Sequence, residues 1–199
     1  MSGGAPAVFL DRDGVLVDET GYLTRVEDLR LFPGAGSAVR RLHALGYPVV
    51  VVTNQSAVAR GMVSMAGLEE IHSALRAQLG QDDARLDGLY LCPHHPEAPL
   101  PEWRQDCDCR KPRPGMLVRA ARELGLALDA RSVLVGDQQT DLECARRAGI
   151  SALLVRTGKG ESTARTVAEG SGIIGICDSI ADVPDVLRSW AGRHWGVTT

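Results

Sequence analysis

Six short apolar runs recur along the chain, and segments with a helical pattern separate them. The runs lie near residues 7–10, 48–52, 88–91, 132–135, 152–155 and 173–176. Strands that are apolar on both faces are typical of parallel sheets, because helices cover such sheets on both sides. The alternation therefore predicts an α/β fold with a doubly wound, mainly parallel, Rossmann-like sheet.

Helix signals fall between these runs. Pro33-Gly34 precede a predicted helix that ends near Leu45, and residues 68–79 carry an apolar stripe at helical spacing. Pro114 marks another helix start, and residues 183–190 have the pattern of a packing helix. A chain of 199 residues has room for one well-buried domain of this class, so we expect residues 1–199 to form a single domain.

Charge and hydropathy argue against several classes of partner. The formal net charge is −3 and no basic stripe is present, which disfavours nucleic acid and anionic membranes as partners. No apolar stretch approaches the ~20 residues needed to cross a bilayer. We therefore expect a cytoplasmic protein that acts on a small molecule, and we also expect it to be a monomer.

The first apolar run ends at two aspartates, in Val8-Phe9-Leu10-Asp11-Arg12-Asp13-Gly14. Open α/β sheets bind their ligands at the carboxyl ends of strands, which is where these carboxylates are expected to lie. Neighbouring carboxylates repel each other, so such a pair indicates a bound cation or a carboxyl group that holds a proton. The alternative, from these residues alone, is an ordinary Asx turn after a strand.

Three later segments supply groups that would complement an attacking aspartate. An aspartate that attacks a phosphate ester needs a magnesium ion and a cationic side chain to neutralise charge. Thr53-Asn54-Gln55-Ser56 follow the second apolar run, and their hydroxyl and amide groups are suited to hydrogen-bond phosphate oxygens. Arg110-Lys111 precede a helix start, and Gly136-Asp137 follow another run, with Asp141 four residues on.

The order of these motifs resembles that of the haloacid dehalogenase superfamily of phosphotransferases, over residues 8 to about 155. The resemblance implies that Asp11 is the nucleophile and that Asp13 is the general acid and base. It also implies a magnesium ion held by Asp11, Asp137 and the backbone carbonyl of Asp13. Thr53 and Lys111 match the second and third motifs and are expected to be catalytic.

Four residues between the second and third motifs predict a structural zinc site. Cys92, His94, Cys107 and Cys109 offer three thiolates and one imidazole, which is a complete tetrahedral set for zinc. His95 is an alternative ligand to His94. Zinc would hold the loop of about residues 92–109 in one conformation. The other two cysteines, Cys144 and Cys177, are expected to be small core residues.

The zinc loop reads Cys-Pro-His-His-Pro, followed later by Cys-Asp-Cys-Arg-Lys-Pro. It resembles the D-glycero-D-manno-heptose 1,7-bisphosphate 7-phosphatases and also the histidinol-phosphate phosphatase domains. The first resemblance implies hydrolysis of the C7 phosphate of a heptose bisphosphate to give heptose 1-phosphate, with either anomer open. A histidinol-phosphate phosphatase, a phosphate-transferring mutase and a non-catalytic zinc-stabilised binding module are the alternatives.

Cationic and polar side chains near the motifs form the predicted substrate-binding set. Arg60 and Arg110 are expected to meet the second phosphate of a bisphosphate. Asn54 and Gln55 follow the second strand, and Asp18 lies in the segment after the nucleophile, which forms a flap in this superfamily. The segment from Leu16 to Leu31 is too short for a large cap domain, so we expect a site open enough for a sugar phosphate.

Three residues depart from the family's pattern. Ala57 and Ala59 stand where the family loop has glycines, and alanine takes a positive φ at greater cost than glycine. Gln138 stands where heptose phosphatases commonly carry lysine.

Glu19 and Tyr22, in the flap segment, are further candidates to face the substrate.

Overall fold

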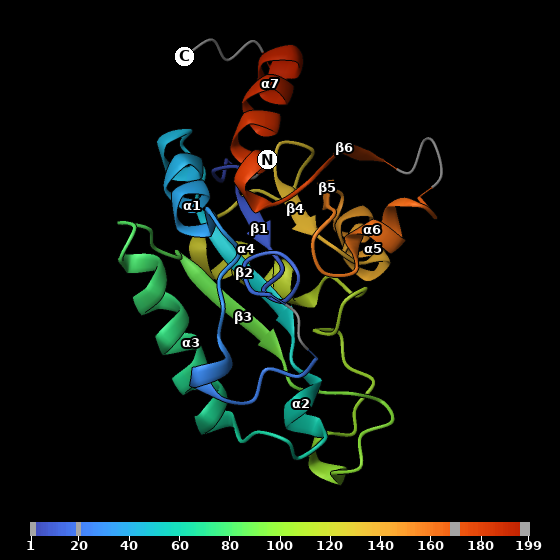
Figure 1. The fold of residues 1–199 in the computed structure, drawn as a ribbon. Coiled ribbons are helices and arrows are strands. Elements are labelled where there is room, and N and C mark those ends of the chain that lie inside the picture. The colour runs from blue at the N-terminus through green and yellow to red at the C-terminus, as the bar shows by residue number, and fades with distance from the viewer. Residues whose placement is uncertain (1–2, 19–20, 168–171, 196–199) are drawn as a thin grey trace.

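Six parallel strands form one sheet in the order β3-β2-β1-β4-β5-β6 (Figure 1). The computed structural model describes residues 3–18, 21–167 and 172–195. The strands are β1 (Val8–Leu10), β2 (Val49–Asn54), β3 (Gly88–Cys92), β4 (Val133–Gly136), β5 (Ser151–Val155) and β6 (Ile173–Cys177). Each begins and ends within two residues of a predicted apolar run, so the predicted α/β fold class is confirmed.

Helices follow the strands in the expected alternation. They are α1 (Ala35–Ala44), α2 (Ser56–Ala59), α3 (Met65–Gly80), α4 (Gly115–Leu124), α5 (Gln139–Ala148), α6 (Gly160–Ala164) and α7 (Val183–Trp195), with 3₁₀ turns at η1 (Val26–Asp28), η2 (Pro101–Trp103) and η3 (Ile180–Asp182). Gly34, in the left-handed conformation, precedes α1, and the Ser64 hydroxyl caps α3 by accepting from the Gly67 amide.

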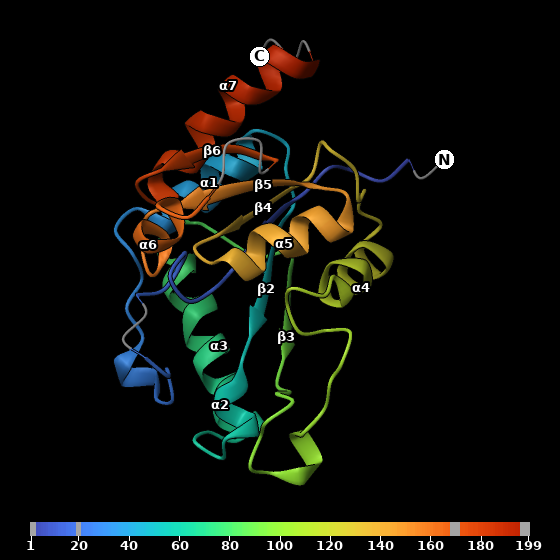
Figure 2. The same cartoon turned by 90° about the vertical axis from the view of Figure 1, so that its right-hand side faces the viewer.

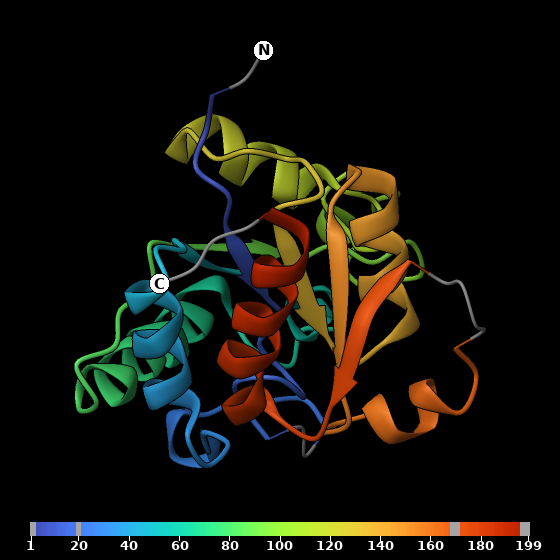
Figure 3. The same cartoon turned by 90° about the horizontal axis from the view of Figure 1, so that it is seen from above.

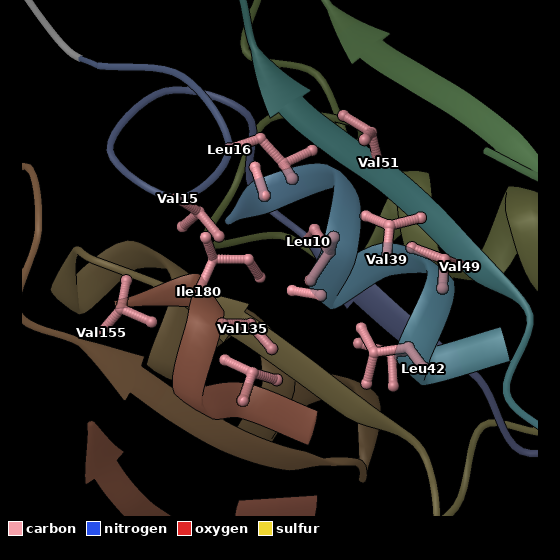
Figure 4. Close-up of a cluster of buried hydrophobic side chains, with 14 of the residues drawn as sticks. Leu10, Val15, Leu16, Val39, Leu42, Val49, Val51, Val135, Val155 and Ile180 are labelled. Atoms are coloured by element: carbon pink, nitrogen blue, oxygen red, sulfur yellow. The ribbon is translucent and has the colours of Figure 1, made fainter. Parts of the chain in front are cut away.

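The helices cover both faces of the sheet, as Figures 2 and 3 show. Alternate residues of each strand point to opposite faces, so Val8 and Leu10 pack with α1, α3 and α7, while Phe9 packs with α4 and α5. Figure 4 shows part of the first cluster, where Val39 and Leu42 of α1 lie over the strands. Burial of one such side chain contributes about 1.5–3 kcal/mol. Cys144 and Cys177 are buried in these two clusters, as expected.

The sheet order places a binding crevice at the carboxyl end of β1. The chain runs outward from β1 to β2 and β3, and then returns to the other side of β1 with β4. Ligands bind at such a switch point in open α/β sheets. Asp11 follows β1, Thr53 lies near the end of β2, and Asp137 follows β4, so three predicted site residues meet there.

The segment between β1 and α1 is a compact flap. Val17 bridges both Asp13 and Leu31, which folds the segment back beside β1. In the described part of residues 11–34, η1 is the only helical turn, so no cap domain is present there. The loop between β3 and α4 contacts α2 through η2 on the same end of the sheet (Figures 1 and 2). Within the described residues, no helix has the length and apolarity needed to cross a bilayer.

Candidate active site

A cavity of about 780 Å³ opens at the carboxyl ends of β1 and β2. Most of the predicted catalytic and substrate-binding residues line it: Asp11, Asp13, Thr53, Asn54, Gln55, Arg60, Arg110 and Lys111. Tyr22, His95, Gln138 and Lys159 also line the cavity. Asp18 is exposed and is not among the lining residues, and Glu19 lies outside the described residues.

Lys111 lies between two buried carboxylates. Its Nζ is 2.9 Å from Oδ2 of Asp11 and 2.7 Å from Oδ1 of Asp141, and it donates to the backbone oxygen of Val52 at 3.0 Å. Burial alone would lower the pKa of Lys111, but the charges of Asp11 and Asp141 outweigh burial and raise the pKa above its usual value. Burial raises the pKa of Asp141 to about 6, although Lys111 opposes this shift. The ammonium group is therefore a fixed positive charge beside Asp11.

Asp137 lies against backbone that only glycine allows. Its Oδ2 accepts from the Lys159 amide at 2.8 Å, and its backbone oxygen accepts from the Thr163 hydroxyl at 2.7 Å. Gly14 and Gly158 both have positive φ, and a Cβ on either glycine would clash with the Asp137 carboxylate. These contacts hold Asp137 facing β1 across the switch point.

The carboxylates here form a donor set suited to magnesium. Oxygens of Asp11, Asp137 and Asp141 lie within 4.8 Å of one another, and all three residues are buried. Magnesium prefers oxygen ligands of this kind, so the residues fit the ion that the sequence predicts. The side chain of Asp13 is not in this set, and its backbone carbonyl stays a predicted ligand.

The Asp13 side chain is held by a buried arginine, Arg12, for which no role was predicted. Arg12 is fully buried, and its Nε and Nη2 donate to the two carboxylate oxygens of Asp13 at 2.9 and 2.8 Å. Its Nη2 also donates to Oε1 of Gln55 at 2.9 Å, and Nη1 lies 3.0 Å from Nε2 of His72. The Gln55 amide donates to Oδ2 of Asp13 and to the Thr53 hydroxyl, both at 2.8 Å. Asp13 thus has its orientation set while it still lines the cavity.

The four predicted zinc ligands converge. Sγ of Cys109 lies 3.1 Å from Sγ of both Cys92 and Cys107, and 3.4 Å from Nδ1 of His94. Interaction with the neighbouring Cys92 side chain is the main cause that lowers the pKa of Cys109 to about 5. Three thiols and one imidazole in this arrangement fit a closed zinc site. His94 belongs to the cluster, whereas His95 lines the cavity instead.

Two arginines, Arg60 and Arg110, also line the cavity. Nη1 of Arg110 donates to the backbone oxygen of His94 at 3.2 Å, so the zinc loop positions this side chain. The Arg60 guanidinium lies 5.7 Å from the centre of the Tyr22 ring, and this contact joins the flap to the end of α2. Proximity to Arg110 and Arg60 adds to burial in lowering the pKa of His95. This part of the cavity is suited to an anionic group.

The residues that depart from the family's pattern fit their local backbone. Ala57 and Ala59 lie within α2, and neither is among the described residues with positive φ. No glycine is therefore required at either position. Gln138 caps α5 in a reciprocal capping box with Asp141, and it also lines the cavity.

Four site residues were absent from the predicted set: Arg12, His72, Asp141 and Lys159. Asp141 was part of the fourth motif but had no assigned role. His72 carried a usable signal, because it lies in the stripe of Leu68, Ile71 and Leu75 and is fully buried with them. Arg12 and Lys159 carried no signal, since arginine and lysine in turns are usually solvated.

The chain is similar to known proteins along nearly its whole length. A family model described as HAD-hydrolase-like matches residues 108–183. The D-glycero-beta-D-manno-heptose-1,7-bisphosphate 7-phosphatase of Salmonella typhi is 40% identical over 190 residues, covering 94% of this chain and 98% of the relative. The protein of the same name from Haemophilus influenzae is 41% identical over 188 residues, covering 92% and 96%.

A solved structure of a protein with a similar name also matches the chain. The crystal structure of D,D-heptose 1,7-bisphosphate phosphatase from B. bronchiseptica, complexed with magnesium and phosphate, matches with a TM-score of 0.82 and 34% identity. The match covers 92% of this chain and 98% of that chain.

Proposed function

The chain belongs to the heptose-1,7-bisphosphate 7-phosphatase family of haloacid dehalogenase-like hydrolases, and from this premise we propose that it hydrolyses the C7 phosphate of D-glycero-β-D-manno-heptose 1,7-bisphosphate. The products are the heptose 1-phosphate and inorganic phosphate. The observation that carries the proposal is the buried Lys111 ion pair with Asp11, placed in a cavity that Arg60 and Arg110 also line. The β anomer is proposed because the relatives' names specify it.

Asp11 and Asp13 carry the chemistry in this proposal. The Asp11 carboxylate attacks phosphorus, and the bond from phosphorus to the C7 oxygen breaks with its electron pair left on that oxygen. The oxygen takes a proton from the Asp13 carboxyl group. A water molecule then attacks phosphorus, Asp13 accepts its proton, and the bond to Asp11 breaks to release inorganic phosphate.

Fixed charges at the site stabilise the phosphate as it is transferred. Phosphate monoesters hydrolyse very slowly without a catalyst, so several groups must neutralise the oxygens of one phosphate. Lys111 supplies a buried ammonium group, and Thr53 and Asn54 supply hydrogen-bond donors at the end of β2. Mg²⁺, held by Asp11, Asp137 and the backbone carbonyl of Asp13, would add positive charge to the same oxygens.

The second phosphate of the substrate, on C1, is proposed to bind Arg60 and Arg110. Arg60 and Arg110 are the predicted ligands, and His95 lies near both of them. Arginine binds phosphate through paired N–H donors, which suits it to this role. Asp18 is exposed and does not line the cavity. It stays a proposed substrate-binding residue of the flap, and it would contact the substrate only if the flap closed.

The zinc loop is proposed to be a structural support for this site. Zn²⁺ bound by Cys92, His94, Cys107 and Cys109 would fix the loop from which Arg110 and Lys111 extend. Residues 1–199 are proposed to act as one phosphatase domain. That the protein is monomeric and cytoplasmic stays a prediction.

The first test is phosphate release in Mg²⁺ from equal concentrations of both heptose 1,7-bisphosphate anomers and histidinol phosphate. We expect preference for the β heptose anomer, with the C1 phosphate retained in the product. Preference for histidinol phosphate would contradict the proposed heptose substrate but would still support the proposed phosphatase reaction. The relatives named above do not favour that alternative.

A matched variant tests whether the chain is an enzyme. Asp11→Asn is expected to keep the fold and zinc content while turnover falls at least about 10³-fold, because an amide is a poor nucleophile. Binding without turnover in the wild-type protein would favour the zinc-stabilised binding module. Isomeric sugar phosphate without net inorganic phosphate would favour a mutase.

A further inference from the structure

His72 lies beneath the active site, on α3, and has no part in the chemistry proposed above. Its side chain is fully buried in the face of α3 that packs on the sheet. A histidine in such a stripe is usually a core residue, so its role depends on what its ring contacts. The ring meets the buried guanidinium of Arg12, with Nε2 lying 3.0 Å from Nη1.

The direction of this hydrogen bond is determined by chemistry. Guanidinium nitrogens donate and cannot accept, so Nε2 of His72 must be the acceptor and the ring must be neutral. The ring proton is then on Nδ1, where the nearest carboxylate oxygen, Oε2 of Glu69, lies 3.9 Å away, beyond hydrogen-bond distance. Nδ1 has no hydrogen-bond partner among the described residues. His72 therefore forms its ring hydrogen bond with Arg12.

Arg12 has few other acceptors. Nε and Nη2 are used by Asp13 and Gln55, while Nη1 faces His72. Because Arg12 is fully buried, water cannot replace a lost acceptor at Nη1 without rearrangement. A guanidinium is rigid and planar, so its position at Nη1 also fixes the two N–H bonds that reach Asp13.

We propose that His72 is a positioning residue that holds Arg12 so that Arg12 and Gln55 keep the Asp13 carboxyl group in place beside Asp11. The inference rests on the proposed function, because it assigns His72 an effect on the proton transfer by Asp13. Asp13 is partly exposed to the cavity, so the Arg12 fork and the Gln55 amide act from behind and leave one side of the carboxyl group open. Loss of the His72 acceptor lets the guanidinium shift, and Asp13 shifts with it.

Three substitutions separate this role from packing. His72→Gln places an amide oxygen near the position of Nε2 and keeps an acceptor for Arg12. His72→Asn is the matched control, because its shorter amide ends near the position of Nδ1 and does not reach Arg12. His72→Leu removes the acceptor and keeps an apolar side chain in the stripe. If one of the last two fails to fold, the other still tests the proposal.

The readout is the first-turnover rate of leaving-group release, measured for two substrates with enzyme in excess. Release of the sugar alkoxide needs a proton from Asp13, whereas p-nitrophenolate leaves p-nitrophenyl phosphate without one. We expect His72→Asn and His72→Leu to slow sugar release by about 10²-fold, within the usual contribution of general acid catalysis, and to slow p-nitrophenolate release less than about 3-fold. His72→Gln is expected to stay near the wild-type rate with both substrates.

Equal losses with both substrates would overturn the inference, since general damage to the site would then explain them. Unchanged rates in His72→Asn and His72→Leu would also overturn it. Failure of the wild-type protein to release phosphate from the heptose bisphosphate would overturn the proposed function instead. The two failures are thus told apart by the wild-type measurement.

Discussion

Asn54 and Lys111 hold each other through a reciprocal pair of hydrogen bonds. The Lys111 amide donates to Oδ1 of Asn54 at 3.0 Å, and Nδ2 of Asn54 donates to the Lys111 backbone oxygen at 3.2 Å. The side chain at the end of β2 thus fixes the backbone that carries the Lys111 ammonium group. Because Lys111 comes two residues after Cys109, the zinc cluster lies next to the same backbone.

We expect removal of zinc to lower activity while the Asp11 side chain itself is left unchanged. Nη1 of Arg110 donates to the backbone oxygen of His94 at 3.2 Å. The backbone N–H of Gln55 donates to the backbone oxygen of Cys92 at 2.7 Å. A loosened loop would therefore displace residues on both sides of the cavity. A zinc-selective chelator in excess Mg²⁺ is expected to release one zinc per chain and lower kcat at least about tenfold, with recovery when zinc is returned.

Cys177→Ala is the control for the zinc measurement. Cys177 is buried far along the sheet, in β6, and is not part of the thiol cluster. The variant is expected to keep one zinc per chain and wild-type kcat. Full activity in zinc-free protein would contradict the supporting role of the loop.

Substitution of Lys111 by methionine is expected to lower both stability and turnover. The change leaves Asp11 and Asp141 as buried carboxylates without their shared cation. Removing one partner of a buried ion pair costs about 3–5 kcal/mol, and loss of one charge-stabilising donor lowers kcat about 10²–10³-fold. Thermal unfolding and steady-state kinetics measure the two effects.

Arg122→Met is the matched control for this substitution. Arg122 is an exposed cation on α4, and its pair with Glu123 is 3.8 Å long. Its removal is expected to change stability by less than about 0.5 kcal/mol. A Lys111→Met protein with wild-type kcat would rule out Lys111 as a catalytic residue.

The strands and the motif residues at their ends could be predicted because both signals are local. A buried parallel strand needs an uninterrupted apolar run, and the ligand site lies where that run ends, so position indicated the segments after the runs, and the order of the family's motifs then singled out Asp11, Thr53 and Asp137. The Cys/His cluster that could hold zinc was equally clear, because three cysteines and a histidine at close spacing have few other uses in a chain of this kind.

The contacts beneath the site were not predictable, because they join residues that are distant in sequence. Arg12 is 60 positions from His72, and nothing near either residue in the sequence indicates that they meet. The pairing of Lys111 with Asp141 likewise depends on how α5 and the zinc loop approach β1. The conformational cost expected for alanine at positions 57 and 59 was also inferred from local sequence, on the assumption that the backbone there has a positive φ. Both residues lie in the helix α2, where a positive φ is not required.

Arg110→Gln is expected to show which of the two substrate phosphates Arg110 binds. We expect KM for heptose 1,7-bisphosphate to rise about tenfold or more, because a charge-assisted contact to the C1 phosphate is lost. Kinetics with heptose 7-phosphate, which lacks that phosphate, should change less than about 3-fold. Equal losses with both substrates would place Arg110 at the transferred phosphate instead.

Arg104→Gln is the control within the same loop. Nε of Arg104 donates to the backbone oxygen of Ala98 at 2.6 Å, and the side chain does not line the cavity. A loss of loop structure would affect both substrates in this variant. We expect no difference between the two substrates.

Acid should destabilise the protein through His72. Burial, together with the charges of Arg12 and Arg76, lowers the pKa of His72 from 6.5 to about 3. Between these values the unfolded chain binds a proton that the folded protein excludes. The free energy of unfolding therefore falls as pH decreases from about 6.5 to about 3, by up to about 1.4 kcal/mol per pH unit, and this contribution is fully present only above pH 6.5.

His72→Gln does not titrate, so it should remove this pH dependence while it keeps an acceptor for Arg12. Urea unfolding at pH 7 and pH 4.5 measures the free energy of unfolding of both proteins. We expect the wild-type protein to lose about 2–3 kcal/mol more than the variant between the two pH values. Carboxylates shared by both proteins cancel in this difference, so parallel losses would mean that His72 titrates alike in the folded and unfolded chain and does not accept from Arg12 as a neutral ring.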